Sequence, residues 1–210
     1  MKFIQIIFLL IGKCNEKLSR WMDFFHLRYA KAYLSYKKAE YHDDICFYGK
    51  PKLNLGKESK VRIGKKFICR SGRSTKLDNG AYSSFQVLDG GTLTIGDYSG
   101  MTNTIIVCKQ CITIGHHVNI GNGTIIMDND LHSTDWETRS DRSADTMHCI
   151  SKPVIIEDHV FVGARSIILK GVTIGEKSIV AAGSVVTHNI PSGEIWGGNP
   201  ARFIKKIENG

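Results

Sequence analysis

An aliphatic residue recurs every six positions over much of this chain, and this spacing limits the folds available to it. From Ile156, each step of six lands on a β-branched aliphatic residue, and the six positions are Ile156, Val162, Ile168, Ile174, Val180 and Val186. The residue four places further along is small or branched at every step, from Val160 to Ile190. A period of six matches neither the two-residue alternation of a strand nor the turn of a helix. It is typical of a solenoid whose short strands form triangular coils.

The same count appears upstream with one interruption. It lands on three residues, one extra residue intervenes, and it then resumes, at Ile95, Met101, Val107, Ile114, Ile120 and Ile126. A weaker start is visible around Leu55 and Ile63. We expect the aliphatic residues to point inward and to stack on their equivalents in the next coil, with Gly, Asn or Asp at the tight corners.

The count therefore predicts an all-β solenoid, a parallel β-helix, as the fold class. The β-helix is expected over residues 51–190, after an N-terminal α-helical segment at 1–50 and before a C-terminal tail at 191–210. A prism this short has a narrow core and gains stability when its flat sides pack against copies of itself. A homotrimer is the expected assembly.

The count fails in the stretch IIMDNDLHSTDWETRS, residues 125–140. The next inward position after Ile126 is residue 132, and it holds His132 instead of an aliphatic residue. The count resumes only at Ile156, so residues 133–152 are expected to leave the coil as a loop. Loops on a rigid scaffold commonly carry functional residues.

His132 is the candidate catalytic residue because histidine is well suited to act as a general base near neutral pH. Asp128, Asp130 and Asp135 lie close in sequence, and one of these carboxylates could hold the ring in the required tautomer. The alternative is a polar cluster that only shapes a turn. Three further loop residues either contact a sugar or an acidic group or are ordinary loop residues: Trp136, Arg139 and Arg142.

The net charge and the cysteines limit which partners, disulfides and metal sites are expected. The net charge of +8 favours an anionic partner, but no RNA-recognition or helix-turn-helix signature accompanies it, so nucleic acid is not expected. The six cysteines are irregularly spaced and suggest no disulfide framework. Cys108 and Cys111 form a C-x-x-C without a second pair, so no metal site is expected.

The N-terminal segment leaves two interpretations open. Its apolar run, Phe3–Ile11, is too short to span a bilayer and is followed by a poor signal-peptide cleavage site. From there to about Tyr41 the sequence predicts an amphipathic helix with Trp21 and Phe25 among basic residues. Such a helix lies on a membrane surface, or it packs on its own domain or a neighbouring subunit. The expected location is the cytoplasm, with peripheral attachment to the inner face of the membrane under the first interpretation.

The run KPVIIEDHVFVGARSIILKGVTIGEKSIVAAGSVVT, followed by GGNPARFIKKI, resembles the hexapeptide-repeat acyltransferases, whose fold is a left-handed parallel β-helix. The segment DNDLHSTD is similar to the active-site histidine segment of the maltose/galactoside O-acetyltransferase branch and of capsule and sialic acid O-acetyltransferases. The resemblance covers about residues 90–207 and leaves out the N-terminal helix. It implies an acetyl-CoA-dependent O-acetyltransferase that acts on a sugar hydroxyl of a surface polysaccharide or its precursor.

The resemblance also implies roles for single residues. His132 matches the base that takes the proton from the acceptor hydroxyl. Phe161 stands where relatives usually have a tryptophan that lines the acceptor site, and Asp130 is a second candidate for contact with this carbohydrate acceptor. The oxyanion formed in the reaction needs hydrogen-bond donors, and Asn103 is the candidate that the sequence offers.

Acetyl-CoA is expected in the groove between two subunits. Residues that match this groove are Ala164, Ala182 and Thr187. Arg202 and Lys205 match the basic residues near the nucleotide phosphates, where charged donors are favoured.

Three other interpretations compete with this one. A γ-class carbonic anhydrase uses the same prism with three zinc-binding histidines, but no two of the eight histidines here have the expected five-residue spacing. A serine acetyltransferase-like enzyme places its histidine in a different segment and has a longer N-terminal helical domain. A non-catalytic β-helix scaffold subunit would neither bind coenzyme A nor depend on His132.

Overall fold

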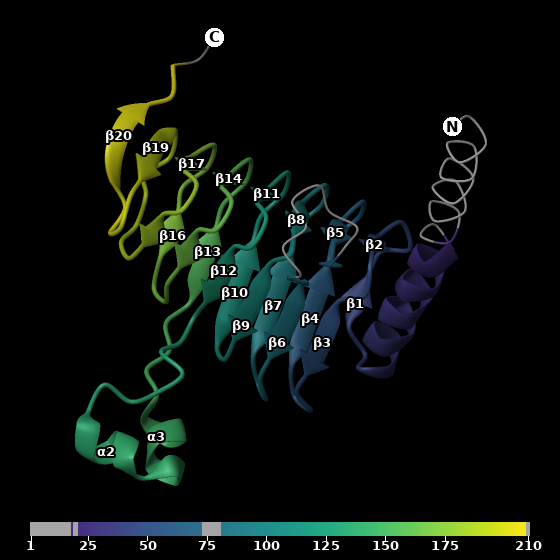
Figure 1. Ribbon diagram of the computed structural model, residues 1–210, viewed down its shortest axis with the longest axis horizontal. Helices are drawn as coiled ribbons and strands as arrows, with labels where there is room; N and C mark the ends of the chain where they lie inside the picture. The colour runs from purple at the N-terminus through teal and green to yellow at the C-terminus, as the bar shows by residue number, and fades with distance from the viewer. Residues whose placement is uncertain (1–17, 19–20, 73–80, 209–210) are drawn as a thin grey trace, which may run out of the picture.

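The computed structural model of this protein describes residue 18, residues 21–72 and residues 81–208. In this part of the chain the strands form three sheets, which we name A, B and C (Figure 1). Sheet A consists of β1 (Glu40–Tyr41), β4 (Lys60–Ile63), β7 (Thr92–Ile95), β10 (Cys111–Ile114), β13 (Val154–Ile156) and β16 (Thr173–Ile174). Sheet B consists of β2 (Cys46–Tyr48), β5 (Ile68–Arg70), β8 (Gly100–Thr102), β11 (Asn119–Ile120), β14 (Phe161–Val162), β17 (Ile179–Val180), β19 (Glu194–Gly197) and β20 (Arg202–Lys206). Sheet C consists of β3 (Lys52–Leu55), β6 (Ser84–Val87), β9 (Ile105–Cys108), β12 (Ile125–Met127), β15 (Ile167–Ile168) and β18 (Val185–Val186).

The chain visits sheets A, B and C in turn, and each strand up to β19 pairs in parallel with the strand one coil away. Ile126 lies opposite Ile168, which in turn lies opposite Val186. This arrangement confirms the predicted all-β solenoid, a left-handed parallel β-helix with an extruded loop. We call its three long edges the A–B, B–C and C–A edges after the sheets that meet there.

The core is the stack of inward residues that the six-residue count predicts. All six downstream positions, from Ile156 to Val186, have no exposed surface. The residues four places further along, from Val160 to Ile190, are buried as well. Because each coil covers the aliphatic residues of the one before, removal of apolar surface from water stabilises the stack by about 25 cal/mol for each Å².

The upstream count is wrong at one position. It expects Val107 to point inward, but the fully buried residue is Ile106, which lies opposite Ile126, and Val107 is partly exposed. β9 has two inward residues, Ile106 and Cys108, on alternate positions. A step of six from Met101 lands on the outward residue between them.

The N-terminal helix is described over residues 21–36 and packs on the first coil. Ala30 and Leu34 are fully buried against the core. β1 begins at Glu40, earlier than the expected start of the β-helix at residue 51, because β1 and β2 already pair with sheets A and B. The run Phe3–Ile11 lies outside the described residues. Among the helices that the structure describes, none is long and apolar enough to cross a membrane.

The C-terminal segment extends sheet B and does not form a free tail. β19 pairs in parallel with β17, and β20 then turns back to pair with β19 in the antiparallel direction. An uncovered strand edge is a site for unwanted pairing. The hairpin of β19 and β20 covers the edge of β17.

Candidate active site

The loop leaves the solenoid at the C–A edge, between β12 and β13, and projects away from the prism (Figure 1). It carries two short helices, α2 (Trp136–Ser140) and α3 (Arg142–His148). The side chain of Asp135 accepts hydrogen bonds at the start of α2, and that of Asp141 does the same for α3. Such N-caps satisfy backbone N–H groups that have no partner within the helix.

Asp128 ends the regular wall. Its side chain is fully buried, and its two oxygens accept hydrogen bonds from the backbone N–H groups of Lys109 (2.8 Å), Gln110 (2.7 Å) and Cys111 (2.7 Å). These three amides form the C–A corner of the preceding coil. Asp128 therefore fixes the point where the loop begins.

His132 does not occupy an inward position, which corrects the expectation from the count. Its side chain is 68% exposed. The chain has already left the wall at Asp128, and an isolated bridge between Asn129 and Ser151 joins the two ends of the loop. His132 therefore lies within the loop, beyond the corner of the prism.

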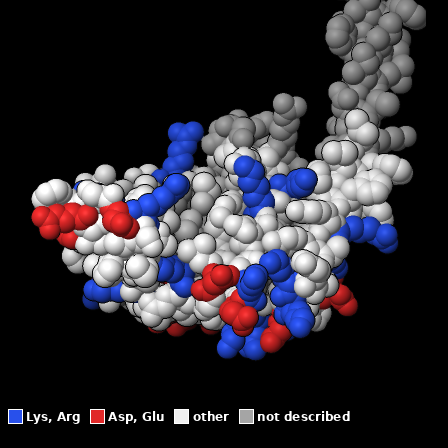
Figure 2. All heavy atoms as spheres, turned by 90° about the horizontal axis from the view of Figure 1, so that it is seen from below, with Lys and Arg blue, Asp and Glu red and all other residues white. Residues whose placement is uncertain are grey.

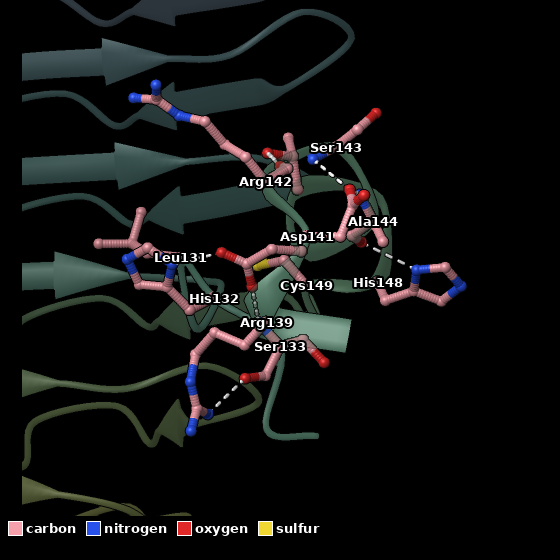
Figure 3. A network of polar contacts seen from close by, with 12 residues as sticks. Leu131, His132, Ser133, Arg139, Asp141, Arg142, Ser143, Ala144, His148 and Cys149 are labelled. Carbon is pink, nitrogen blue, oxygen red and sulfur yellow. Dashed lines mark hydrogen bonds and ion pairs between the residues drawn. The ribbon is translucent and has the colours of Figure 1, made fainter. Parts of the chain in front are cut away.

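The imidazole of His132 is held by Asp145 on α3. Nδ1 of His132 lies 2.7 Å from Oδ2 of Asp145, and Oδ1 of Asp145 accepts a hydrogen bond from the backbone N–H of Ser133 at 2.5 Å. Figure 3 shows the polar network around His132 and Ser133. The bond to His132, followed by the bond from Ser133, lowers the pKa of Asp145 below its usual value. Because an ionised carboxylate only accepts hydrogen bonds, Nδ1 carries the proton. Nε2 then has a free lone pair and is able to accept a proton from a substrate.

None of the three carboxylates closest to His132 in sequence orients it. Asp128 binds the corner amides, Oδ1 of Asp130 lies 2.6 Å from Nζ of Lys170, and Asp135 caps α2. Asp145 is thirteen residues downstream of His132. The sequence marks Asp145 only as one of several carboxylates inside the predicted loop.

Two lysines from neighbouring coils hold the two arms of the loop. Nζ of Lys109, at the C–A corner of the preceding coil, donates to the backbone oxygens of Thr146 (3.2 Å) and Cys149 (3.3 Å) at the end of α3. Lys170, at the same edge of the following coil, pairs with Asp130, two residues before His132. The arm that carries His132 and the helix that carries Asp145 are therefore each attached to the rigid solenoid.

The candidate acceptor-site residues lie in different places. Oδ2 of Asp130 is buried and has no hydrogen-bond partner among the described residues. Phe161 is about half-exposed on β14 and lines a hollow of about 290 Å³ on the outer face of sheet B. Within one chain, Phe161 is on sheet B and His132 is at the C–A edge, so the fold does not bring the two together.

The residues expected to contact acetyl-CoA also divide into groups. Ala164 and Ala182 lie at the B–C edge in successive coils. Arg202 and Lys205 are exposed on β20 at the end of sheet B. Thr187 follows β18 of sheet C, and its hydroxyl lies 2.7 Å from Nδ1 of His188.

Asn103 is not placed to donate to an oxyanion. It is buried at the B–C edge, where its Nδ2 donates to Oδ1 of Asn122 at 2.7 Å. Its own Oδ1 accepts from the backbone N–H of Gly72 at 2.8 Å. The side-chain amide therefore links neighbouring coils.

Three or more His, Cys, Asp or Glu residues do not converge on a metal position anywhere in residues 18, 21–72 and 81–208. Cys108 of the C-x-x-C pair is buried, and burial raises the pKa of its thiol, with a further contribution from Asp128. The thiolate is the form that binds metals, so this environment does not favour Cys108 as a ligand.

Comparisons with known proteins find a matching family model and several curated relatives. A family model described as the hexapeptide repeat of succinyl-transferase matches residues 153–188. The chain is 36% identical over 110 residues to gamma carbonic anhydrase 2, mitochondrial, of Arabidopsis thaliana, which covers 46% of this chain and 40% of that protein. It is 52% identical over 56 residues to the 2,3,4,5-tetrahydropyridine-2,6-dicarboxylate N-acetyltransferase of Clostridium perfringens, covering 27% and 24%. The matches thus span less than half the length of these curated relatives.

Solved structures match over more of the chain. A hexapeptide-repeat-containing acetyltransferase from Vibrio cholerae O1 biovar eltor, in complex with acetyl coenzyme A, is 33% identical over 74% of this chain and 72% of that chain, with a TM-score of 0.51. A maltose O-acetyltransferase from Clostridium difficile 630 is 28% identical over 74% and 70%, with a TM-score of 0.51. The polySia-specific acetyltransferase NeuO is 25% identical over 82% and 76%, with a TM-score of 0.53.

Proposed function

This chain belongs to the hexapeptide-repeat acyltransferase family, and from that premise we propose that it is an acetyl-CoA-dependent O-acetyltransferase that acts on a sugar hydroxyl of a surface polysaccharide or its precursor. The observation that carries the proposal is the hydrogen bond between His132 and Asp145 on a loop anchored to a rigid solenoid. Similarity to a maltose O-acetyltransferase and to a polySia-specific acetyltransferase supports a sugar acceptor.

In the proposed mechanism, His132 and Asp145 act as a general-base pair. Acetyl-CoA supplies an activated thioester carbonyl. Nε2 of His132 takes the proton from the acceptor hydroxyl as the hydroxyl oxygen forms a bond to that carbonyl carbon. When the carbon–sulfur bond breaks, the imidazolium returns the proton to the departing sulfur. Asp145 holds Nδ1–H and stabilises the positively charged ring.

We propose that acetyl-CoA binds along the side of the prism that carries Ala164 and Ala182. Small side chains at this edge let an extended ligand approach the backbone of the coils. Arg202 and Lys205, both exposed on β20, supply charged donors for phosphate oxygens. Thr187 is the third residue that we assign to this groove.

The acceptor site is proposed to form between two copies of the chain, in a homotrimer. Phe161 on sheet B is able to face a His132 at the C–A edge only when it comes from another copy. The loop also presents apolar side chains to solvent that a partner would cover: Leu131, Trp136, Met147 and Ile150. Asp130 lies beside His132 in sequence and is the second residue that we assign to the acceptor.

Peripheral attachment to the inner face of the membrane is part of this proposal and rests on the N-terminal helix. Trp21, Phe24 and Phe25 are each about half-exposed or more, and the guanidinium of Arg28 lies 4.7 Å above the ring of Phe24. Exposed aromatic rings beside basic groups suit the interface of a bilayer. A Trp21→Ser, Phe25→Ser variant should lose binding to anionic vesicles if this attachment exists, and unchanged binding would argue against it.

The function is tested by incubating the protein with acetyl-CoA and a panel of neutral and acidic sugars, and by measuring thiol release and acetyl-ester formation. We expect His132→Ala to abolish sugar-dependent thiol release, and His159→Ala, an exposed histidine at the A–B edge, to leave it unchanged. Equal rates in wild type and His132→Ala would overturn the role of His132. Transfer to free serine alone would favour the serine acetyltransferase alternative, and stoichiometric zinc with CO₂ hydration would favour a carbonic anhydrase.

A further inference from the structure

A basic groove runs along the same edge of the solenoid as the loop. It has a volume of about 490 Å³ and is formed by the end of the N-terminal helix, the first C–A corner and the outer face of sheet A. Its cationic residues are Lys37, Lys38, Lys57, Lys60 and Arg62, and we call this site the basic groove. Two carboxylates, Glu40 and Glu58, also line it, so five cations and two anions leave a net charge of +3.

The lysines of the basic groove have no carboxylate partner among the described residues. Arg62 pairs with Glu40, at 2.9 Å between Nε and Oε2. Within the described residues, the ammonium groups of Lys37, Lys38, Lys57 and Lys60 form no ion pair. Like charges gathered in a concave site create a positive potential that attracts anionic ligands.

The basic groove and the candidate active site share the C–A edge. Lys57 lies at the corner between β3 and β4, and the loop leaves the same edge three coils further along. Neighbouring strands are about 4.8 Å apart, so the two sites are separated by about 14 Å along the edge. Figure 2 looks at this side of the molecule and shows basic groups crowded around a few carboxylates near the N-terminal end of the solenoid.

The chemistry of the groove suits a sugar chain. Its walls and floor include the hydroxyl groups of Ser59, Thr92 and Thr94 beside the lysines. Hydroxyl groups donate and accept hydrogen bonds with sugar hydroxyls, and ammonium groups bind carboxylates. A bilayer surface is flat and does not enter a groove, whereas an extended polymer chain does.

We propose that the basic groove docks a polyanionic glycan, so that a chain of acidic sugars lies along the C–A edge and presents a hydroxyl to His132. This inference rests on the proposed function and names the class of its acceptor. The groove holds sugars remote from the reacting one. It therefore affects the KM for a long acceptor, while kcat and the KM for a single sugar stay as they are.

The test compares a groove variant with a variant that loses the same charge elsewhere. The groove variant carries Lys37→Gln, Lys57→Gln and Lys60→Gln. The control carries Lys65→Gln, Lys66→Gln and Lys177→Gln at the A–B edge. Binding of fluorescent polysialic acid and polygalacturonic acid is measured without acetyl-CoA, with dextran as the neutral polymer and anionic phosphatidylserine vesicles as the second polyanion.

We expect the groove variant to bind the acidic polymers about tenfold more weakly at low salt and the control to bind them within about twofold of wild type. High salt should remove the difference, because it screens exposed charges. Equal losses in both variants, or a loss confined to vesicles, would overturn the glycan groove. If the basic groove binds glycan but no sugar supports thiol release, the proposed reaction is wrong and the glycan-binding role of the groove is retained. If a single sugar is acetylated and the groove variant binds polymer normally, only the glycan-binding role of the groove is wrong.

Discussion

Nδ1 of His132 lies 2.7 Å from Oδ2 of Asp145, although the two residues are thirteen positions apart in the sequence, with helix α2 between them. The contact joins the first arm of the loop to its second helix. The orientation of the imidazole therefore depends on how the loop folds back on itself, and both arms are fixed to the solenoid by lysines.

Replacing Asp145 with Asn should lower kcat for acetyl transfer by about 10²–10⁴-fold, because the amide neither selects the tautomer nor stabilises the imidazolium. Steady-state kinetics with acetyl-CoA and an acceptor sugar measures the change in kcat. Glu137→Gln, which neutralises an exposed carboxylate on α2 of the same loop, serves as the control and should leave kcat unchanged. An unaltered kcat in Asp145→Asn would contradict the pairing.

The anchoring of α3 should depend on pH in the acidic range. The pKa of Asp145 is lowered in the folded state from its usual 3.8, chiefly by the hydrogen bond with His132. A lowered pKa stabilises the fold at pH values above 3.8, and this contribution is lost as the pH falls through the lowered value. Amide hydrogen exchange should show α3 protected down to about pH 4 and progressively less protected as the pH falls below 3.8, with the pH dependence weakened in Asp145→Asn. Exposure of α3 that begins well above pH 4 would contradict this assignment.

Much of the wall could be predicted from the sequence, because every coil repeats the packing of the coil before it. A residue such as Ile168 lies opposite Val186, three six-residue steps further along, so a local period determines which side chains point inward. The count failed at Val107 because β9 has two inward residues, Ile106 and Cys108, and a step of six from Met101 lands between them. β7 and β10 also have two inward residues each, but there the count meets the second of them, Ile95 and Ile114.

The site could be predicted only in part. The break in the count located the loop and its histidine, since any departure from a regular repeat is visible in sequence. The partner of His132 was not predictable in this way, because two short helices carry no readable period and place Asp145 beside His132 only after they fold. Asp128, Asp130 and Asp135 were closer along the chain, but each contacts a different partner, which sequence distance does not reveal.

The ion pair between Lys170 and Asp130 should position His132 without taking part in the reaction. Lys170→Met should lower kcat by about tenfold and leave the KM for acetyl-CoA unchanged, while Lys170→Arg should keep most of the activity. A double-mutant cycle with Asp130→Asn should give a coupling free energy of about 1 kcal/mol for unfolding, because the pair is partly exposed. Lys177→Met, which removes an exposed lysine from the A–B edge, is the control. Additive effects of the two changes on the free energy of unfolding, together with an unchanged kcat in Lys170→Met, would argue against this role.

Asp128→Ala should destabilise the corner where the loop begins. Three backbone N–H groups at a partly buried corner lose their acceptor, and a hydrogen bond to a charged group contributes roughly 1.5–3 kcal/mol, so a loss of about 3 kcal/mol or more in the free energy of unfolding is expected. Denaturant unfolding measures it. Asp89→Ala is the matched control, since its exposed carboxylate accepts an amide hydrogen bond at an earlier C–A corner. Equal losses in the two variants would show that burial of the Asp128 carboxylate adds nothing to the free energy of unfolding.

Gly163→Ala should destabilise the solenoid more than Gly183→Ala, although both glycines lie at the B–C edge. A Cβ at Gly163 would lie 2.4 Å from the backbone nitrogen of Ala182, so the coils would have to move apart. A Cβ at Gly183 meets nothing within 4 Å, but the residue has a φ of +72°, which alanine adopts at a cost of about 1 kcal/mol.

We expect a loss of about 2–4 kcal/mol in the free energy of unfolding for Gly163→Ala and about 1 kcal/mol for Gly183→Ala. Thermal and denaturant unfolding of the two variants side by side measures the difference. The reverse order would mean that the coils relax easily at this edge. The spacing between the coils at this edge would then change easily. The close approach of a ligand to Ala164 and Ala182 would not depend on a fixed spacing.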